Sequence, residues 1–173
     1  MVGLPELFNL LADEEALVAG AENEDGPTSQ LLRSKARQHN IYIHGGSMPT
    51  LIPGSERIGN TTFVFDPTGA LIARYQKIHL FDIHLEGQNS YKESARVAPG
   101  EAMVTFETEH GNVGLTICYD IRFPELYRAL TLAGARVIFH PAAFTLYTGK
   151  DHWETLIRAR AIENQVYMVS PAQ

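Results

Sequence analysis

Cysteine is almost absent from this sequence, and its scarcity limits the chemistry that can stabilise the fold. The 173 residues include one cysteine, Cys118, so no disulfide can form within the chain. Such low cysteine usage is typical of reducing compartments, and we expect a cytoplasmic protein. The one thiol has no cysteine partner, and it therefore needs a separate explanation.

Long apolar runs and basic clusters are also missing. The longest apolar runs, such as Val137 to Phe139, are far shorter than the ~20 residues that cross a bilayer, and no basic and then apolar leader opens the chain. The formal net charge is -6, without a clustered basic face that would neutralise phosphates. We therefore expect neither a membrane nor a nucleic acid as a partner.

The composition itself is that of a folded domain. Apolar residues make up 45% of the chain and charged residues 20%, which is typical of globular proteins. A length of 173 residues is enough to bury a core, and we predict one domain over residues 1–173. Short apolar or β-branched runs alternate with segments of helical periodicity, and this alternation predicts the α/β class.

The pattern also predicts where the elements lie. We expect helices at residues 27–38, 124–132 and 151–164, strands at 41–44, 137–139 and 166–169, and hairpins that pair 61–65 with 71–75 and 104–107 with 113–117. The inner face of the last helix should consist of Trp153, Leu156, Ile157 and Ala161. Two stretches without a clear pattern, 83–101 and 141–150, are candidates for the walls of a site, because long irregular loops are often functional.

Cys118 lies where such chains often display a nucleophile. It follows the apolar run Val113 to Ile117 and precedes the helix that has Pro124 in its first turn, so we predict a strand-to-helix turn. The positive potential of a helix N-terminus favours thiolate over thiol at such a position. The alternative is a buried core cysteine, which is the commoner fate of a lone cysteine.

Three short blocks of sequence carry a family resemblance. Leu4-Pro5-Glu6, Tyr75-Gln76-Lys77-Ile78-His79-Leu80-Phe81 and Cys118-Tyr119-Asp120-Ile121-Arg122-Phe123-Pro124-Glu125 resemble the three motif blocks of the nitrilase, or carbon-nitrogen hydrolase, superfamily, in the family's order. The similarity continues through His152-Trp153 and residues 158–165, so it covers nearly the whole chain. Within the superfamily the chain looks most similar to the omega-amidase-like branch.

The resemblance implies a fold and a set of catalytic residues. It implies an α-β-β-α sandwich in which Glu6, Lys77 and Cys118 meet at one end of two mixed sheets flanked by helices. Glu6 is then the general base, Cys118 the nucleophile that forms a thioester, and Lys77 the cation that stabilises the oxyanion together with the backbone N–H of Tyr119. Glu93 matches a second family glutamate that orients the substrate or fixes its neighbours.

The resemblance also implies a substrate and an assembly. The expected reaction is hydrolysis of a small amide with release of ammonia, without a cofactor or a metal, and we expect Tyr119, Arg122 and Phe144 to line the substrate site. Omega-amidases suggest an amide with a distal carboxylate, which the guanidinium of Arg122 could bind, although a structural salt bridge is an equal alternative. Deaminated glutathione is a competing substrate. Family members usually pair through the helices near the cysteine, so we expect a homodimer or a higher homo-oligomer.

Two other readings of the site have little support in the sequence, so we expect the histidines to be structural or pocket-lining and predict no metal, while one alternative for the whole chain remains open. His79, His84, His140 and His152 could supply a Cys-His pair, but no cysteine-protease signature surrounds Cys118. His79 and His84 lie beside Asp82 without the further ligands that a metal site needs. Family members carry a strand and a helix before the glutamate motif and further strands at the other end, so we expect a chain incomplete at both termini. The second functional hypothesis is therefore an inactive fragment or a binding module that retains the family core.

Overall fold

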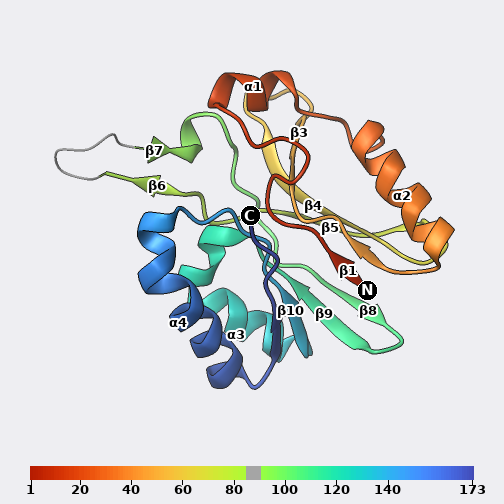
Figure 1. Ribbon diagram of the computed structural model, residues 1–173, viewed down its shortest axis with the longest axis vertical. Coiled ribbons are helices and arrows are strands. Elements are labelled where there is room, and N and C mark those ends of the chain that lie inside the picture. Colours follow the sequence, from red (N-terminus) through yellow and green to blue (C-terminus); the bar gives the residue numbers. More distant parts are fainter. Residues whose placement is uncertain (85–90) are drawn as a thin grey trace.

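Two β-sheets pack face to face between two layers of helices (Figure 1). This computed structural model describes residues 1–84 and 91–173. Helix α2 (Pro27–His39) covers the outer face of one sheet, and helices α3 (Pro124–Leu132) and α4 (Leu146–Asn164) cover the outer face of the other. The predicted α-β-β-α sandwich is confirmed. Within the described residues, no helix is both long enough and apolar enough to cross a membrane.

The first sheet carries two of the three motif blocks. Its strands are β1 (Val2–Gly3), β2 (Ile43–His44), β3 (Met48–Thr50), β4 (Gly59–Phe65) and β5 (Leu71–Gln76). The long strand β4 pairs antiparallel with β2 and β3 along one side and with β5 along the other, whereas β1 lies parallel to β2. Glu6 therefore follows the first strand of this sheet and Lys77 follows the last.

The second sheet carries the cysteine block. Its strands are β8 (Thr105–Thr108), β9 (Gly111–Leu115), β10 (Val137–Phe139) and β11 (Tyr167–Val169), in the order β11-β10-β9-β8. Strands β9, β10 and β11 are parallel, as expected where helices form the connections. A short 3-10 helix, η2 (Cys118–Arg122), follows β9 and leads into α3. Cys118 thus lies at the predicted strand-to-helix turn.

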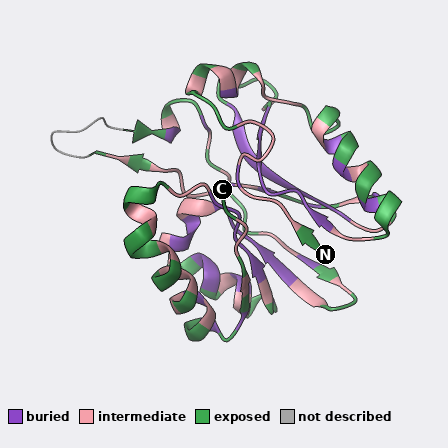
Figure 2. Cartoon of the chain, in the orientation of Figure 1, coloured by how far each residue is buried: buried purple, intermediate pink, exposed green. Residues whose placement is uncertain are grey.

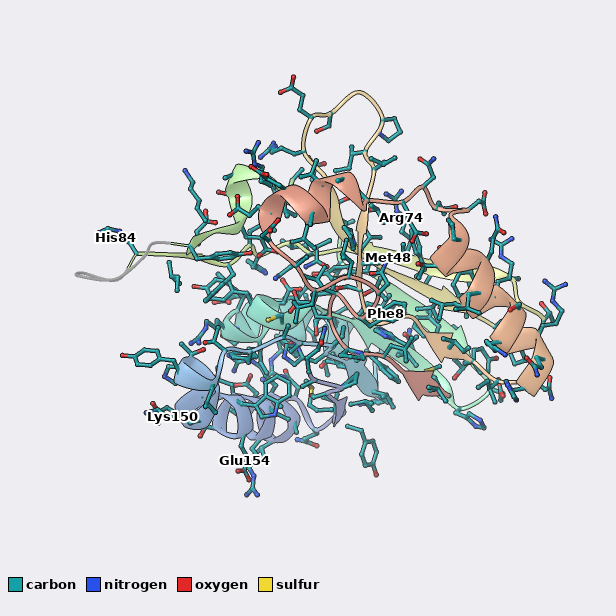
Figure 3. The ribbon with its side chains drawn as sticks, turned by 45° about the horizontal axis from the view of Figure 1, so that its top comes forward. Phe8, Met48, Arg74, His84, Lys150 and Glu154 are labelled. Carbon is teal, nitrogen blue, oxygen red and sulfur yellow. The ribbon has the colours of Figure 1, made fainter. Side chains whose placement is uncertain are left out.

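The core includes three layers of apolar side chains between the sheets and the helices. Between the sheets lie Val64, Ala73, Tyr75, Phe106, Val113, Leu115, Ile117 and Phe139. A second cluster joins α3 and α4 to the second sheet, and a third joins α2 to the first sheet. Figure 2 shows the strands mostly buried and the outward faces of the helices exposed. In Figure 3, Lys150 and Glu154 point outward from α4, while Met48 lies inside the fold.

The last helix differs from its prediction. Helix α4 begins at Leu146 rather than at residue 151, because the side chain of Thr145 caps it by accepting from the backbone N–H of Thr148. The stretch 141–150 is therefore only half irregular. The predicted inner face is partly buried, and the fully buried positions on α4 are Arg160 and Asn164. Arg160 reaches this position because its guanidinium donates to the backbone oxygen of Ile121.

Short elements escaped the sequence pattern. They are α1 (Glu14–Ala19), β1, β3, the pair β6 (Asp82–Ile83) and β7 (Tyr91–Lys92), and the 3-10 turn η1 (Glu93–Ala95). The stretch 83–101 therefore contains ordered pieces, and residues 85–90 lie outside the described residues. Several strands also have other limits than predicted. Strand β2 spans only Ile43–His44, β8 and β9 form a tighter hairpin than expected, and β11 begins at Tyr167. Hydrogen-bond pairing, which the pattern does not encode, sets these limits.

Two buried histidines should make the fold sensitive to mild acid. His44 and His140 are fully buried, and burial lowers the pKa of each from 6.5 to about 3. Above pH 6.5 both rings are neutral in the folded and the unfolded chain. Below it the unfolded chain binds protons that the folded chain excludes, so the free energy of unfolding should fall by roughly 2 kcal/mol per histidine between pH 7 and pH 5.

Urea unfolding at pH 7, 6 and 5 measures this loss. His44→Gln and His140→Gln should each remove about half of the pH dependence, because a glutamine does not titrate in this range. The two single variants serve as controls for each other, and the double variant should unfold with little pH dependence. An equal free energy of unfolding for the parent protein at pH 7 and pH 5 would contradict the prediction.

Candidate active site

Glu6 lies in a tight loop that the neighbouring strands hold in place. The backbone oxygen of Pro5 accepts from the N–H of Ser47, and the hydroxyl of Ser47 accepts from the N–H of Leu7. Gly46 makes this close approach possible, because a Cβ built there would lie 1.9 Å from the backbone oxygen of Pro5. Leu7 adopts a left-handed conformation with φ 50°, which costs a non-glycine residue about 1–2 kcal/mol. The fold therefore accepts strain in order to turn the Glu6 side chain inward.

Lys77 lies between two carboxylates. Its Nζ is 2.9 Å from Oε1 of Glu6 and 3.0 Å from Oε2 of Glu93. All three side chains are buried. The backbone holds Lys77 on both sides, because its N–H donates to the oxygen of Asn60 and its oxygen accepts from Gly100. The strand end is thus fixed, and the ammonium can neither leave the cluster nor reach water freely.

Asn60 completes this cluster and was not predicted from the sequence. Its side-chain amide donates to Oε1 of Glu6 at 3.0 Å and to Oε1 of Glu93 at 3.3 Å. The backbone N–H of Ala143 donates to the other oxygen of Glu6 at 2.9 Å. Neither residue stands in a motif block, and only the paired strands and the loop after β10 bring them to the site. The carboxylate of Glu6 therefore has donors on both oxygens.

Cys118 occupies a strained turn beside this cluster. Its φ is 45°, in the left-handed region, and its backbone N–H donates to the oxygen of Pro141 at 2.9 Å. Strain of this kind costs on the order of 1–3 kcal/mol and is common at functional sites. The thiol lies beside the carboxylate of Glu6, and each group changes the pKa of the other. Glu6, Lys77 and Cys118, far apart in the sequence, are neighbours in the fold.

The protonation states follow from burial and from Lys77. Burial alone would raise the pKa of Glu6, but the charge of Lys77 and the hydrogen bonds from Cys118, Lys77 and Asn60 bring it below 4.5. Burial opposes the charge of Lys77, yet Glu6 and Glu93 hold its pKa well above 10.5. Burial and the negative charge of Glu6 raise the pKa of the Cys118 thiol well above 9.0. The resting site therefore holds a carboxylate, an ammonium and a neutral thiol.

The thiol state corrects an expectation from the sequence. A helix N-terminus was expected to favour thiolate at Cys118, whereas the pKa of this thiol is raised. The helical turn η2 has only five residues, so its dipole is small beside the effects of burial and of the adjacent Glu6 carboxylate. The sulfur must therefore lose its proton to a base during attack.

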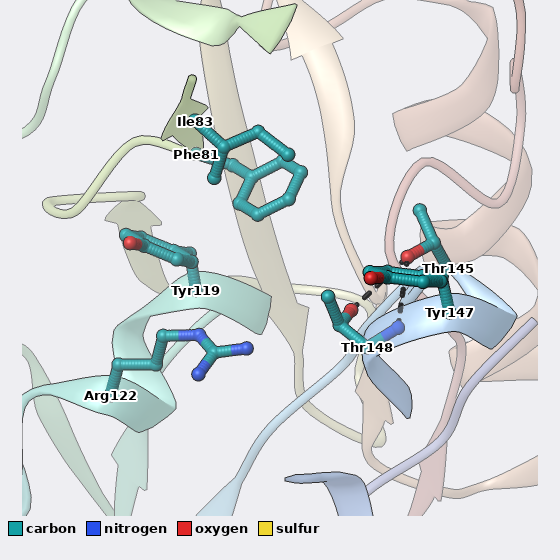
Figure 4. Close-up of a pocket in the computed structure, with 7 residues that line it drawn as sticks. All are labelled: Phe81, Ile83, Tyr119, Arg122, Thr145, Tyr147 and Thr148. Carbon is teal, nitrogen blue, oxygen red and sulfur yellow. Dashed lines mark hydrogen bonds between the residues drawn. The ribbon is translucent and has the colours of Figure 1, made fainter. Parts of the chain in front are cut away.

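Two adjoining cavities open at this site. The inner one, of about 280 Å³, is lined by Glu6, Leu7, Leu11, Lys77, Phe81, Ile83, Tyr91, Glu93, Cys118, Tyr119, Ala143, Phe144, Thr145 and Thr148. The outer one, of about 420 Å³, is lined by Phe81, Ile83, Tyr119, Arg122, Thr145, Tyr147 and Thr148 (Figure 4). The expected site residues Tyr119 and Phe144 line the inner cavity, and Arg122 lines the outer one. The shared residues make the two cavities one path to the sulfur.

Comparison with known proteins decides the family. The family described as carbon-nitrogen hydrolase matches residues 1–173. The chain belongs to this family. It is 45% identical to deaminated glutathione amidase of Synechocystis, covering 100% of this chain and 65% of that protein, and 43% identical to omega-amidase NIT2 of Homo sapiens, covering 100% and 63%. The predicted resemblance to the nitrilase superfamily and its omega-amidase-like branch is therefore confirmed.

A solved structure supports the same assignment. The NitFhit protein of C. elegans matches this carbon-nitrogen hydrolase chain with a TM-score of 0.92 and 40% identity, covering 100% of this chain and 43% of that one. Of the two curated relatives, the chain spans 65% and 63% of the length, which is just under two thirds.

The remaining histidines take part in other contacts. The ring of His79 bonds Asp120 and stacks on Phe123 with 3.6 Å between ring centroids. The ring of His140 contacts the hydroxyls of Thr116 and Tyr127, and His152 bonds Arg122. The described parts of the chain contain no group of three or more His, Cys, Asp or Glu side chains that could hold a metal ion.

Proposed function

We propose that this carbon-nitrogen hydrolase domain cleaves a small amide through a cysteine thioester and releases ammonia. The observation that supports the proposal is the hydrogen-bonded cluster of Glu6, Lys77 and Glu93 beside Cys118 at the inner end of a cavity. A neutral thiol next to an ionised carboxylate is the starting state that general-base catalysis needs. The same cluster in a binding module would bury charges without using them, which is costly.

The first half of the reaction forms the thioester. Glu6 removes the proton of Cys118 as the sulfur attacks the amide carbon, and the carbonyl oxygen becomes an oxyanion. Lys77 and the N–H of Tyr119, at the start of η2 where helical N–H groups lack partners, stabilise this charge. Glu6 then gives its proton to the amide nitrogen, the carbon-nitrogen bond breaks, and ammonia leaves.

The second half regenerates the enzyme. A water molecule loses a proton to Glu6 and attacks the thioester carbon, Lys77 stabilises the second oxyanion, and the carbon-sulfur bond breaks. The proton on Glu6 returns to the sulfur of Cys118 as the acid product leaves. Glu93 does not transfer protons in this scheme. Its carboxylate holds Lys77 and accepts from the N–H of Phe81, so it positions the cation and the cavity wall.

The position of Arg122 supports the proposal that the substrate carries an anionic group in addition to the amide. Its guanidinium lies over the rings of Tyr119 and Phe144 at 5.6 and 5.9 Å from their centroids. No carboxylate among the described residues pairs with it, although one of its nitrogens contacts His152. A structural salt bridge within the described chain is thus not its role. We propose that it binds the distal carboxylate of the amide.

Replacing Arg122 with alanine should weaken the binding of carboxylate-bearing amides selectively. The KM for the ω-amide of a dicarboxylic keto acid should rise about 10- to 100-fold, the range expected when a charged hydrogen-bond partner is lost. The KM for a neutral aliphatic amide should change little, and this substrate serves as the control. Arg122→Lys should show an intermediate loss because lysine cannot bind in bidentate fashion. Equal losses for both substrates would contradict the assignment.

A substrate panel tests the proposed function as a whole. Purified protein should release ammonia from the ω-amide of a dicarboxylic keto acid, and it should hydrolyse this substrate faster than a neutral amide. The rate at which the protein consumes deaminated glutathione tests the competing substrate. The second hypothesis, a binding module or inactive fragment, predicts no turnover of any amide by protein that remains folded and monodisperse. The location and the assembly remain proposals: the single free thiol supports a cytoplasmic location, and the family resemblance supports a homodimer.

A further inference from the structure

One buried carboxylate near the site has no part in the reaction scheme. Asp120 lies two residues after Cys118, and its side chain is completely buried. Among the described residues no lysine or arginine pairs with it, and only the ring of His79 lies within ion-pair distance, at 2.7 Å. A buried carboxylate is costly unless hydrogen bonds satisfy both of its oxygens. Its partners therefore indicate why it is there.

Each oxygen of Asp120 binds a different part of the site. Oδ1 accepts from the backbone N–H of His79 at 3.0 Å and contacts the His79 ring at 2.7 Å. Oδ2 accepts from the backbone N–H of Ile117 at 2.8 Å and from the hydroxyl of Tyr75 at 2.7 Å. Thus one oxygen holds the segment just after Lys77, and the other holds the residue just before Cys118.

This bridge links the two sheets at the point where the chemistry takes place. Lys77 directly follows β5 of the first sheet, and Cys118 lies shortly after β9 of the second. The strands themselves do not pair across the sheets, so backbone hydrogen bonds within a sheet do not set the distance between these residues. The strained backbone of Cys118, with φ 45°, also needs surrounding contacts that hold it. The carboxylate of Asp120 supplies both a link between the two sheets and a contact that holds the strained Cys118 turn.

We propose that Asp120 is a positioning residue, whose carboxylate fixes the Cys118 turn against the segment after β5 that contains Lys77 and His79. The proposal rests on the proposed function, since it concerns the same reaction. It assigns Asp120 no contact with the substrate and no proton transfer. Its effect is to keep the sulfur, the Tyr119 N–H and the Lys77 ammonium in one geometry, and a displacement of about 1 Å at such a site can cost on the order of 100-fold in rate.

Asp120→Asn tests the proposal with little change of shape. An asparagine has one acceptor oxygen, so its NH₂ group must face either the Ile117 side or the His79 side. The Tyr75 hydroxyl and the His79 ring can change from donor to acceptor, but the backbone N–H groups of Ile117 and His79 cannot. One anchor is therefore lost in either orientation. We expect kcat to fall about 100-fold with KM nearly unchanged.

A matched control separates positioning from stability. Thr50→Val removes a buried hydroxyl that contacts Thr61 at 2.7 Å in the first sheet, and neither threonine is a hydrogen-bond partner of Asp120. It should lower the melting temperature without lowering kcat, because it removes a buried hydrogen bond of similar kind. If Asp120→Asn lowers the melting temperature but leaves kcat as in Thr50→Val, Asp120 is merely structural and the proposal is wrong.

Two further measurements cover the other outcomes. If Asp120→Asn does not fold, Asp120→Glu is the substitute variant, because it retains the charge and all acceptor sites but adds one methylene. A similar loss of kcat in Asp120→Glu supports the proposal, and an unchanged kcat overturns it. If the parent protein hydrolyses no amide, the proposed function fails independently of Asp120. A crystal structure of Asp120→Asn then decides the positioning role: a displaced Cys118 turn on unchanged sheets supports it, and an unmoved turn overturns it.

Discussion

Replacement of Cys118 by alanine should abolish amide hydrolysis. The scheme has no other nucleophile, and removal of an enzyme's nucleophile has cost on the order of 10⁶-fold in kcat where it has been measured. We expect ammonia release to fall by at least about 10⁴-fold while the protein remains folded, because replacing cysteine with alanine removes one sulfur atom and leaves only a small cavity. Steady-state ammonia release, with circular dichroism and melting temperature for folding, measures both effects.

The same variant tests whether a thioester forms. Cys118 is the only cysteine in the chain, so an acyl adduct that hydroxylamine removes identifies it as the site without further mapping. Intact mass spectrometry on protein quenched in the first turnovers should detect this adduct in the parent and not in Cys118→Ala. Serine at the same position serves as the matched control, because it keeps the hydrogen bond to Glu6 but is the weaker nucleophile. Ammonia release by Cys118→Ala at the parent rate would rule out the thioester.

The sequence predicted the parts of the fold that depend on local pattern. Helix α2 was predictable because Pro27 stands at its first turn and Asn40 ends it in the left-handed conformation. The hairpin from β4 to β5 was predictable because Asp66 accepts backbone hydrogen bonds within its turn. The start of α4 was not predicted, because the prediction relied on apolar periodicity and the cap at Thr145 precedes the apolar face by two turns.

The candidate site was only partly accessible from the sequence. Glu6, Lys77 and Cys118 could be selected because they stand in motif blocks, and Glu93 because a family glutamate matches it. Asn60 carries no such signal, and its contacts to two carboxylates exist only after β4 has paired with β5. The contribution of Ala143 could not be predicted either, because its backbone N–H makes the contact and every residue except proline has such a group. The protonation states could not be predicted from the sequence either, because burial and neighbouring charges determine the pKa of Cys118, and both depend on the fold.

The Glu6→Gln variant should show the second large loss of activity. Glutamine keeps the size of the side chain but takes no proton from a thiol whose pKa is raised well above 9.0, so Cys118 stays protonated. The acylation rate should fall about 10²- to 10⁴-fold, the usual range for loss of general acid-base catalysis. Single-turnover kinetics with mass spectrometry of the Cys118 adduct measure this step. In a Cys-His scheme, His79→Ala would instead cause the larger loss.

Combining this change with one at Lys77 tests whether the cluster acts as a unit. Lys77→Met alone leaves the carboxylates of Glu6 and Glu93 buried without their cation, and breaking such a pair costs about 3–5 kcal/mol of stability. Activity should fall by at least about 10²- to 10³-fold, as for the loss of one oxyanion donor. In the double variant Glu6→Gln/Lys77→Met, one of those charges is gone, so stability should partly return.

Activity in the double variant should be far from additive. The two residues serve the same intermediate: without the base the sulfur does not attack, and the oxyanion that Lys77 stabilises does not form. The loss in the double variant should therefore be close to that of Glu6→Gln alone rather than the product of the two single losses. Arg122→Ala combined with Glu6→Gln is the control, because a remote binding contact should contribute independently. A fully multiplicative loss for Glu6 and Lys77 would mean that they contribute independently, and the prediction that the cluster acts as a unit would then be wrong.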